Sequence, residues 1–345
     1  MELPLNHLLK TEYLAKVFNN TSATYKYYWL LALLDSVEIG KQEIKKIELF
    51  SRMIANSWYT VNYFKVSFGS QDLIQEKTKE LLSVSGLPIN ARKNEISKVL
   101  STSTNKKIQR QLFHFNNQVP HWFLSPWYSG KQKQHIYKLS QDGVNKPPYS
   151  LLEDKIIIDK DWFEYFQVNQ KIIRDFTLWN LTDFLEKRNP NTPNISQKLV
   201  KPPERGSLTK QKRKYWDIFL NSNSLNCIFS NQPINPDKYD LDHFIPHSFV
   251  SHDLIWNLIP INPCFNSTKS NKIPNLEFYF SPFYEVQKKA YFSIMESIPK
   301  NFQEEFFQIF GRVESEVDFK LETYRNNIAP LARVALNNGF EELNP

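Results

Sequence analysis

The stretch that decides the fold reads Asp240-Leu-Asp-His-Phe-Ile-Pro-His-Ser-Phe249, then Ile255-Trp-Asn-Leu-Ile-Pro-Ile261, then Cys264-Phe-Asn-Ser-Thr-Lys-Ser-Asn-Lys272. Alternating apolar residues predict a strand over 239–245 that ends at Pro246. A second strand is predicted over 257–261, where Pro260 requires a sheet edge. Pro263 suits the first turn of a helix, because its missing N–H group is not needed there. The three segments together predict two strands followed by one helix.

Polar residues within this stretch recur at separations that favour a functional site over chance. Asp242 and His243 are adjacent, Asn257 lies fourteen residues after His243, and Asn266 lies nine residues after Asn257. Lys269 follows three residues later. In a chain rich in Asn and Lys, such a set arises by chance on the order of one time in a thousand or less.

This segment strongly resembles the HNH, or ββα-metal, nucleases. Within that superfamily it is most similar to the HNH domain of the RNA-guided type II CRISPR effectors. The residues above carry the resemblance, together with Pro246 and Ser248-Phe249, and it covers about a fifth of the chain. The resemblance implies one metal ion that grips the scissile phosphate and stabilises the departing 3′ oxygen, and products with 5′-phosphate and 3′-hydroxyl ends.

The resemblance implies a role for each motif residue, and the residue types suit those roles. His243 is expected to act as general base, since an imidazole can accept a proton near neutral pH. Asp242 and Asn266 are expected to bind Mg²⁺, with Mn²⁺ as an alternative, because Mg²⁺ prefers oxygen ligands and retains bound water. Asn257 is assigned to the catalytic set as the residue that fixes the hairpin and orients His243. A turn asparagine with local backbone bonds is the alternative for Asn257.

Four basic residues are expected to contact nucleic acid. Lys269 and Lys272 lie on or just after the predicted helix, and Lys212 and Arg213 lie in a basic run before Trp216. For each of them, a solvated surface residue is the alternative. Lys and Arg outnumber Asp and Glu by 43 to 36, and the net charge of +7 is compatible with a polyanion partner. DNA is favoured over RNA as that partner.

Many HNH proteins hold a structural zinc ion with two Cys-x-x-Cys pairs, but this chain has only two cysteines. Ser230 follows Cys227, and Ser267 follows Cys264, at the offset where a second cysteine is required. No structural zinc is therefore expected. Apolar packing is expected to replace it, through Trp216, Phe219, Ile228, Phe229 and Phe244.

Two groups of side chains carry weaker signals. His247 and His252 lie close enough in sequence to suggest a metal site, but they are predicted to be solvent-exposed in the loop between the two strands. Trp122, Trp127 and Tyr128, in a segment broken by prolines, are predicted to close the core rather than to stack on bases.

Outside the motif the chain is predicted to be predominantly helical, which gives an α+β class. Helical periodicity is expected over 27–34, 44–58, 71–82, 173–185, 286–298, 302–310 and 313–336. Lys155-Ile-Ile-Ile-Asp159 predicts a strand, and Asp161 is the predicted cap of the helix that follows it. Pro330 is expected to kink or divide the last helix.

Segments rich in proline and asparagine predict the domain boundary. Arg188-Asn-Pro-Asn-Thr-Pro-Asn194 and Lys201-Pro-Pro203 concentrate turn-forming residues. We therefore expect a mostly helical accessory or recognition domain over 1–195, the ββα nuclease module over 205–280, and a C-terminal helical region over 281–345.

Composition predicts a cytoplasmic protein. Two cysteines favour a reducing compartment, and Met1-Glu-Leu-Pro does not resemble the start of a secretory signal. The most apolar stretch, 27–34, has eight residues, whereas a membrane span needs roughly 20. No association with a membrane is expected.

The resemblance predicts a metal-dependent HNH endonuclease. A lone HNH domain with a large accessory domain resembles bacterial restriction and anti-phage defence nucleases, several of which work beside a separate ATPase or sensor protein. By this analogy, an ATPase or sensor protein encoded in the same operon is a candidate partner of this chain. Two alternatives stay open. The first is a catalytically silent nucleic-acid-binding or scaffolding protein that retains the ββα fold. The second is a mobile-element homing nuclease, which would need a recognition module.

Overall fold

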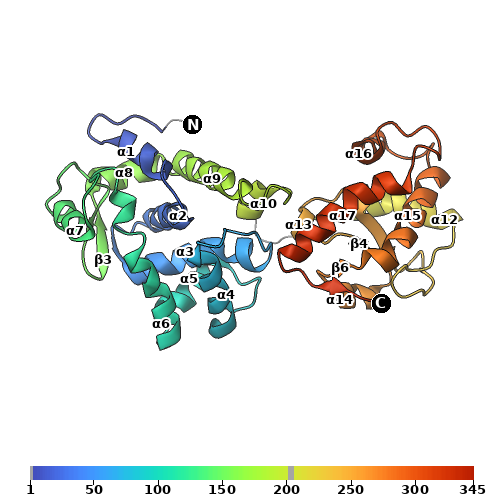
Figure 1. Ribbon diagram of the computed structural model, residues 1–345, viewed down its shortest axis with the longest axis horizontal. Helices are drawn as coiled ribbons and strands as arrows, with labels where there is room; N and C mark the ends of the chain where they lie inside the picture. The colour runs from blue at the N-terminus through green and yellow to red at the C-terminus, as the bar shows by residue number, and fades with distance from the viewer. Residues whose placement is uncertain (1–2, 201–205) are drawn as a thin grey trace. The chain divides into compact units, whose positions relative to one another are not determined.

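The computed structural model describes residues 3–200 and 206–345 (Figure 1). The structure is predominantly helical with small sheets, which confirms the predicted α+β class. The chain divides into two compact units: unit 1 comprises Met1–Pro190 and Ile195–Pro202, and unit 2 comprises Asn191–Asn194 and Pro203–Pro345. The division falls within the boundary segment predicted at 188–194, whereas the one predicted at Lys201-Pro-Pro203 lies outside the described residues.

Unit 1 contains a small sheet surrounded by helices. Its strands have the order β1-β3-β2, and both pairs are antiparallel, so that Ile156 pairs with Ile44 on one side and with Leu151 on the other. In chain order the elements, with η for 3-10 helices, are α1 (Thr11–Ala15), η1 (Lys16–Phe18), α2 (Tyr25–Glu38), β1 (Glu43–Lys45), α3 (Lys46–Asn62), α4 (Leu73–Ser85), α5 (Lys93–Thr102), α6 (Lys106–Phe113), η2 (His114–Asn117), η3 (Trp122–Leu124), α7 (Lys133–Gln141), β2 (Tyr149–Leu151), β3 (Lys155–Ile158), α8 (Lys160–Val168), α9 (Gln170–Glu186) and α10 (Ile195–Val200).

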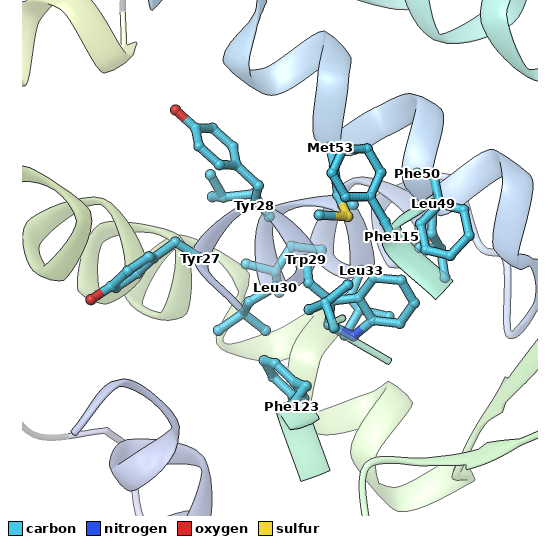
Figure 2. Close-up of a cluster of buried hydrophobic side chains, with 14 of the residues drawn as sticks. Tyr27, Tyr28, Trp29, Leu30, Leu33, Leu49, Phe50, Met53, Phe115 and Phe123 are labelled. Carbon is cyan, nitrogen blue, oxygen red and sulfur yellow. The ribbon is translucent and has the colours of Figure 1, made fainter. Parts of the chain in front are cut away.

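The core of unit 1 is built around α2. Every residue of this helix over 27–37 is buried, as in a helix that other elements cover on all sides. Trp29 of α2 packs against Phe50 of α3, with ring centroids 6.0 Å apart, and Figure 2 shows both side chains among their neighbours. Trp29 Nε1 also donates a hydrogen bond to Tyr149 Oη at 3.0 Å. The one polar atom of this buried indole is therefore paired, as burial requires.

Two local predictions for unit 1 differ from the structure. Ile44 lies in β1, so the helix predicted from that residue begins at Lys46. Asp159, not Asp161, caps α8. Strand β3 ends at Ile158, so Asp159 occupies the position just before the helix. Asp159 Oδ1 accepts hydrogen bonds from the backbone N–H groups of Asp161 and Trp162 at 3.0 and 3.3 Å.

The aromatic cluster of segment 119–128 closes the core only in part. Trp127 and Tyr128 are buried, and the Trp127 ring meets Trp162 edge-on with centroids 5.8 Å apart. Trp122 is 47% exposed. The prediction of core closure is therefore confirmed for Trp127 and Tyr128 and wrong for Trp122.

Unit 2 contains a two-stranded antiparallel sheet, β4-β5, and a short parallel pair, β6-β7. In chain order its elements, with η4 a π-helical turn and η5 a 3-10 helix, are α11 (Thr209–Gln211), η4 (Lys212–Trp216), α12 (Asp217–Ser222), β4 (Asp240–His243), α13 (His247–Val250), η5 (Ile255–Asn257), β5 (Leu258–Ile261), α14 (Pro263–Lys269), β6 (Ile273–Pro274), α15 (Leu276–Ser293), α16 (Lys300–Phe310), α17 (Leu321–Asn337) and β7 (Glu342–Leu343).

The hairpin of unit 2 and the helices that follow it share one hydrophobic core. Phe244, just after β4, stacks on Phe283 of α15 with ring centroids 4.0 Å apart. Gln287 of α15 is fully buried, and its Nε2 donates to the carbonyl oxygen of Leu258 at 2.6 Å. The regions expected at 205–280 and 281–345 thus pack into a single unit, in which α15 contacts the surroundings of both strands through Phe283 and Gln287.

Helices α15 and α17 each continue through a proline. Pro282 lies inside α15 and Pro330 lies inside α17, so Pro330 does not divide the last helix. Ile328 and Ala332, on either side of Pro330, are buried in the core of unit 2, and this packing outweighs the lost backbone hydrogen bond. The helix begins at Leu321, eight residues later than predicted. Within the described residues, no helix has the length and apolar character needed to cross a membrane.

Candidate active site

The hairpin β4-β5 and the helix α14 confirm the predicted arrangement of two strands and a helix. Asp242 pairs with Ile259 and His243 with Leu258 across the hairpin. Successive side chains of a strand point to opposite faces, which separates the Asp242 side chain from that of His243. The turn into α14 is defined by two residues: Asn262 Oδ1 accepts from the backbone N–H of Cys264 at 3.0 Å, and proline occupies the first helical turn.

Asn257 clamps the two ends of the loop between the strands. Its side chain is fully buried. Asn257 Oδ1 accepts from the backbone N–H of Ile245 at 2.9 Å, and its Nδ2 donates to the carbonyl oxygen of Ile245 at 2.8 Å. The Asn257 carbonyl oxygen accepts from the N–H of Phe244 at 2.7 Å. These bonds fix the chain directly after His243, and they involve backbone atoms rather than the imidazole ring.

Two side chains of α14 pair with the two carboxylates of β4. Asn266 Nδ2 donates to Asp240 Oδ2 at 3.0 Å. Lys269 Nζ donates to Asp242 Oδ2 at 2.8 Å and to the carbonyl oxygen of His243 at 2.7 Å. Asp240 and Asp242 therefore lie on the face of the hairpin that α14 covers. Asn266 therefore bonds to Asp240 and not to Asp242. Asp240 is a third side chain with oxygen atoms beside Asp242 and Asn266, the two residues predicted to bind the metal ion.

The environment of Lys269 fits neither of its two predicted roles, a phosphate contact or a solvated helix residue. Its side chain is 0% exposed and forms an ion pair with Asp242, whose side chain is 6% exposed. A buried carboxylate needs a compensating charge, and Lys269 supplies it. This lysine is therefore neither a solvated helix residue nor placed on the surface to meet a phosphate.

On the other side of the hairpin, His243 pairs with Asp253. His243 Nε2 lies 2.9 Å from Asp253 Oδ1, and His247 Nε2 lies 3.8 Å from the same oxygen. The rings of His243 and His247 are 5.2 Å apart between centroids. The His247 side chain is only 14% exposed, so the prediction that it is solvent-exposed is wrong. His252 is half-buried, with its ring 5.2 Å from that of Trp256.

Charge around Asp253 favours its ionised form. The hydrogen bond with His243 lowers the pKa of this carboxyl group, partial burial raises it, and the charge interactions with His243, His247 and His252 lower it further. The backbone that follows the Asp253 side chain is also held by hydrogen bonds. Gln211 Nε2 donates to the Asp253 carbonyl oxygen at 3.0 Å, and the N–H of Ile255 donates to Glu305 Oε2 at 2.5 Å. A fixed anion therefore faces the imidazole of His243.

The donor set on the α14 side fits a hard divalent cation. Asp240 and Asn266 are half-buried and Asp242 is nearly buried, so two carboxylates and one amide offer oxygen atoms from β4 and α14. Among the described residues, no group of three His, Cys, Asp or Glu side chains is arranged to hold a metal ion. Few protein ligands completed by water suit Mg²⁺, whereas a structural zinc needs four closely placed ligands. The two cysteines, Cys227 and Cys264, are free.

The remaining basic residues of the prediction lie at different depths. Lys212 is half-buried in η4: its Nζ donates to the carbonyl oxygen of Tyr239 at 2.8 Å and lies 4.0 Å from the centroid of the Tyr239 ring. Arg213 is exposed on the same π-helical turn, and Lys272 is half-buried just after α14. Only Arg213 of this set is both charged and fully at the surface, whereas Lys212 supports the strand that leads into the site.

Sequence reasoning missed Asp240 and Asp253, and it placed His247 at the surface. Asp240 could have been found, because it stands two residues before Asp242 and a strand places such residues on the same face. Asp253 and His247 carry no comparable signal. Their positions beside His243 depend on how the loop between the strands folds, and no spacing rule describes that loop.

Replacement of Asn257 by alanine is predicted to destabilise unit 2. The change leaves the buried N–H and carbonyl groups of Ile245 without the partners that Asn257 supplies, at a cost of about 2–6 kcal/mol for the two together. Asn223 is the matched control, since its Nδ2 bonds the Phe219 carbonyl at the end of α12 in a more solvated place. Denaturant unfolding should show a large loss of stability for Asn257→Ala and a change within about 0.5 kcal/mol for Asn223→Ala. An equal loss of stability in the two variants would show that the hydrogen bonds of Asn257 do not stabilise unit 2.

Replacement of Asp253 by asparagine is predicted to lower stability in a pH-dependent way. The folded protein lowers the pKa of Asp253. The contribution of this carboxylate to the free energy of unfolding is therefore complete above the pKa of an aspartate in the unfolded chain, about 3.9. It is lost as the pH falls through the lower pKa of Asp253 in the folded protein. Denaturant unfolding should therefore show Asp253→Asn less stable at neutral pH by about 1 kcal/mol. The gap to the wild type should close below about pH 4. Asp237→Asn, at an exposed position, should show no such gap, and a gap that widens on acidification would contradict the interpretation.

Comparison with known proteins agrees with this geometry. Searches of curated proteins and of solved structures gave no match. Residues 227–275 match the family model described as HNH endonuclease, and this span contains β4, β5 and α14 with Asp242, His243, Asn257 and Asn266. HNH nucleases are generally metal-dependent and act on nucleic acid. Residues 227–275 of unit 2 are therefore similar to HNH endonuclease domains, and this similarity supports nuclease activity for the chain.

Proposed function

We propose that unit 2 is a metal-dependent endonuclease that hydrolyses phosphodiester bonds, in DNA rather than RNA, with one Mg²⁺ ion or alternatively Mn²⁺. The observation that carries the proposal is the His243–Asp253 pair at the end of β4, the strand whose α14-facing side carries Asp240 and Asp242. A polarised imidazole and a set of oxygen donors are the two components that hydrolysis of a phosphodiester requires.

His243 is the proposed general base. With Nε2–H donating to the Asp253 carboxylate, Nδ1 is the ring atom that can accept a proton. The proton comes from a water molecule, the resulting hydroxide oxygen bonds to phosphorus, and the bond from phosphorus to the 3′ oxygen breaks. The leaving oxygen takes up a proton to give a 3′-hydroxyl, and the phosphate stays on the 5′ end. Asp253 holds the ring and stabilises the imidazolium that forms.

Asp240, Asp242 and Asn266 would hold the metal ion, which when bound places positive charge beside the scissile phosphate and the leaving oxygen. Asp240 is the more accessible of the two carboxylates. Asn266 can offer its amide oxygen by rotation about its last side-chain bond, because the amide carries both a donor and an acceptor. Lys269 neutralises Asp242 and keeps it oriented. Arg213, on the surface, is the proposed contact to the nucleic-acid backbone, with Lys272 and Lys212 in support.

One observation favours a second candidate function. The ammonium group of Lys269 already neutralises Asp242, as it would in a protein that retains the ββα fold to bind nucleic acid without cutting it. The intact pairing of His243 with Asp253 favours the nuclease. By analogy with lone HNH nucleases, we propose a role in bacterial restriction or anti-phage defence, in the cytoplasm, beside an ATPase or sensor protein encoded in the same operon.

Purified full-length protein is predicted to cut nucleic acid only when a divalent ion is present. Plasmid DNA, single-stranded DNA and RNA are incubated with Mg²⁺, Mn²⁺ or EDTA, and the ends are tested for the 5′-phosphate and 3′-hydroxyl groups that a ligase requires. His243→Ala should lower the cleavage rate by about 100-fold or more, because it removes the general base. Asp240→Asn should raise the Mg²⁺ concentration needed for half-maximal rate.

His135→Ala is the matched control, since this histidine is exposed on α7 of unit 1. The variant should cleave nucleic acid at the rate of the wild type. Cleavage that persists in EDTA, or that is equal for His243→Ala and the wild type, would contradict the proposal. Binding without cleavage of any substrate would favour the second candidate.

A further inference from the structure

Unit 1 contains a long segment without acidic residues. From Ile96 to Gln141 the sequence has seven Lys and Arg residues and neither Asp nor Glu, in a chain that carries 36 acidic residues elsewhere. Helix α6 lies in this segment and exposes Lys106, Lys107 and Arg110. A concentration of one charge on one short helix creates a local positive potential, which the modest net charge of the whole chain does not reveal.

Helix α6 and helix α4 pack against each other (Figure 1). An open cavity lies beside them. The α4–α6 cavity has a volume of about 770 Å³, within the size range of ligand sites. The residues that line it are Lys77 from α4 with Lys107, Arg110, Gln111, Phe113 and His114. Positions 107, 110, 111 and 114 recur at the spacing of one helix face, while Ile108 and Leu112 on the other face are buried in the core.

Cations exceed anions in this cavity. Lys77 is the one lining cation with acidic partners in the described residues: its Nζ lies 2.8 Å from Glu76 Oε1 and 3.5 Å from Glu80 Oε2, and both glutamates belong to α4. Lys107 and Arg110 are exposed on the acid-free helix. Burial lowers the pKa of His114, the charge of Lys77 lowers it further, and the charge of Glu76 raises it. An anionic group is the ligand chemistry that this cavity favours.

An aromatic ring lies beside these cations. Phe113 is 45% exposed although it is a large apolar residue, and one edge of its ring packs on Phe50 with centroids 6.2 Å apart. That contact holds the ring in place while leaving part of it to solvent. Cations that follow a phosphate backbone, combined with an aromatic side chain on which a base can stack, are the elements of single-strand nucleic-acid recognition. A duplex hides the faces of its bases and would leave the Phe113 ring unused.

We propose that the α4–α6 cavity binds a single strand of nucleic acid, with Lys107 and Arg110 contacting phosphates and a base stacked on Phe113. The site belongs to unit 1 and takes no part in the chemistry proposed for His243. It would give the chain a contact with its nucleic-acid partner that is separate from the cleavage site. Because the site is defined by binding and not by cleavage, it can be tested in EDTA.

The test measures fluorescence anisotropy of labelled oligonucleotides with the full-length protein in EDTA. A single-stranded DNA, an RNA of the same sequence and the DNA duplex are titrated at several salt concentrations. The double variant Lys107→Ala/Arg110→Ala should bind single strands about 10-fold more weakly or worse near 0.1 M salt. The slope of log affinity against log salt should fall by about 1.4, which corresponds to two lost phosphate contacts. Phe113→Ala should weaken single-strand binding about 5- to 100-fold and leave duplex binding nearly unchanged.

Lys160→Ala/Lys171→Ala is the matched control, because it removes two exposed lysines from α8 and α9 of the same unit. It should bind single strands within about twofold of the wild type. Wild-type-like binding by Lys107→Ala/Arg110→Ala would overturn the proposal. An equal loss for duplex and single strands, with no effect of Phe113→Ala, would overturn the assignment of a single strand. Cleavage activity does not enter the result, so failure of this site and failure of the nuclease proposal are distinguishable. Comparison of the DNA and RNA arms shows which sugar the cavity prefers.

Discussion

The buried ion pair between Lys269 and Asp242 is the interaction on which the site depends. Lys269 Nζ bonds both the Asp242 carboxylate and the carbonyl oxygen of His243, so one side chain ties α14 to the end of β4. Loss of either partner would leave a buried charge without compensation, at a cost of about 3–5 kcal/mol. The pair also determines where the neighbouring side chains lie, because Asn266 stands one helical turn before Lys269 and therefore meets Asp240, which stands two strand positions before Asp242.

This frame separates two kinds of chemistry on one short strand. The oxygen donors of Asp240 and Asp242 lie on the side of the hairpin that faces α14, whereas His243 turns to Asp253 in the loop. Asn257 closes that loop through the backbone of Ile245. In the proposed function, the base and the cation site would therefore share a strand but lie on different faces of it. The helices α15 and α17 pack into the same hydrophobic core as the hairpin.

Short-range sequence patterns were sufficient to predict the β4-β5 hairpin and the helix α14. Pro263 and Asn262 define the start of α14, and alternating apolar residues define β4, because these features act within a few residues of chain. The burial of Lys269 and the partner of His243 could not be predicted, since both depend on segments that come together only in the folded unit. The same limit explains Pro330: a proline predicts a helix break, but the core contacts that keep α17 continuous are tertiary. The assignment of Asp242, His243 and Asn266 to catalysis stays a prediction.

In the proposed function, one divalent ion binds between β4 and α14. Crystals of the full-length protein grown with Mn²⁺ would test it directly through the anomalous scattering of the metal. We expect one anomalous peak bonded to oxygen atoms of Asp240, Asp242 or Asn266, and no such peak in crystals of Asp240→Asn/Asn266→Ala. A peak elsewhere, or no peak at a Mn²⁺ concentration that supports cleavage, would contradict the claim.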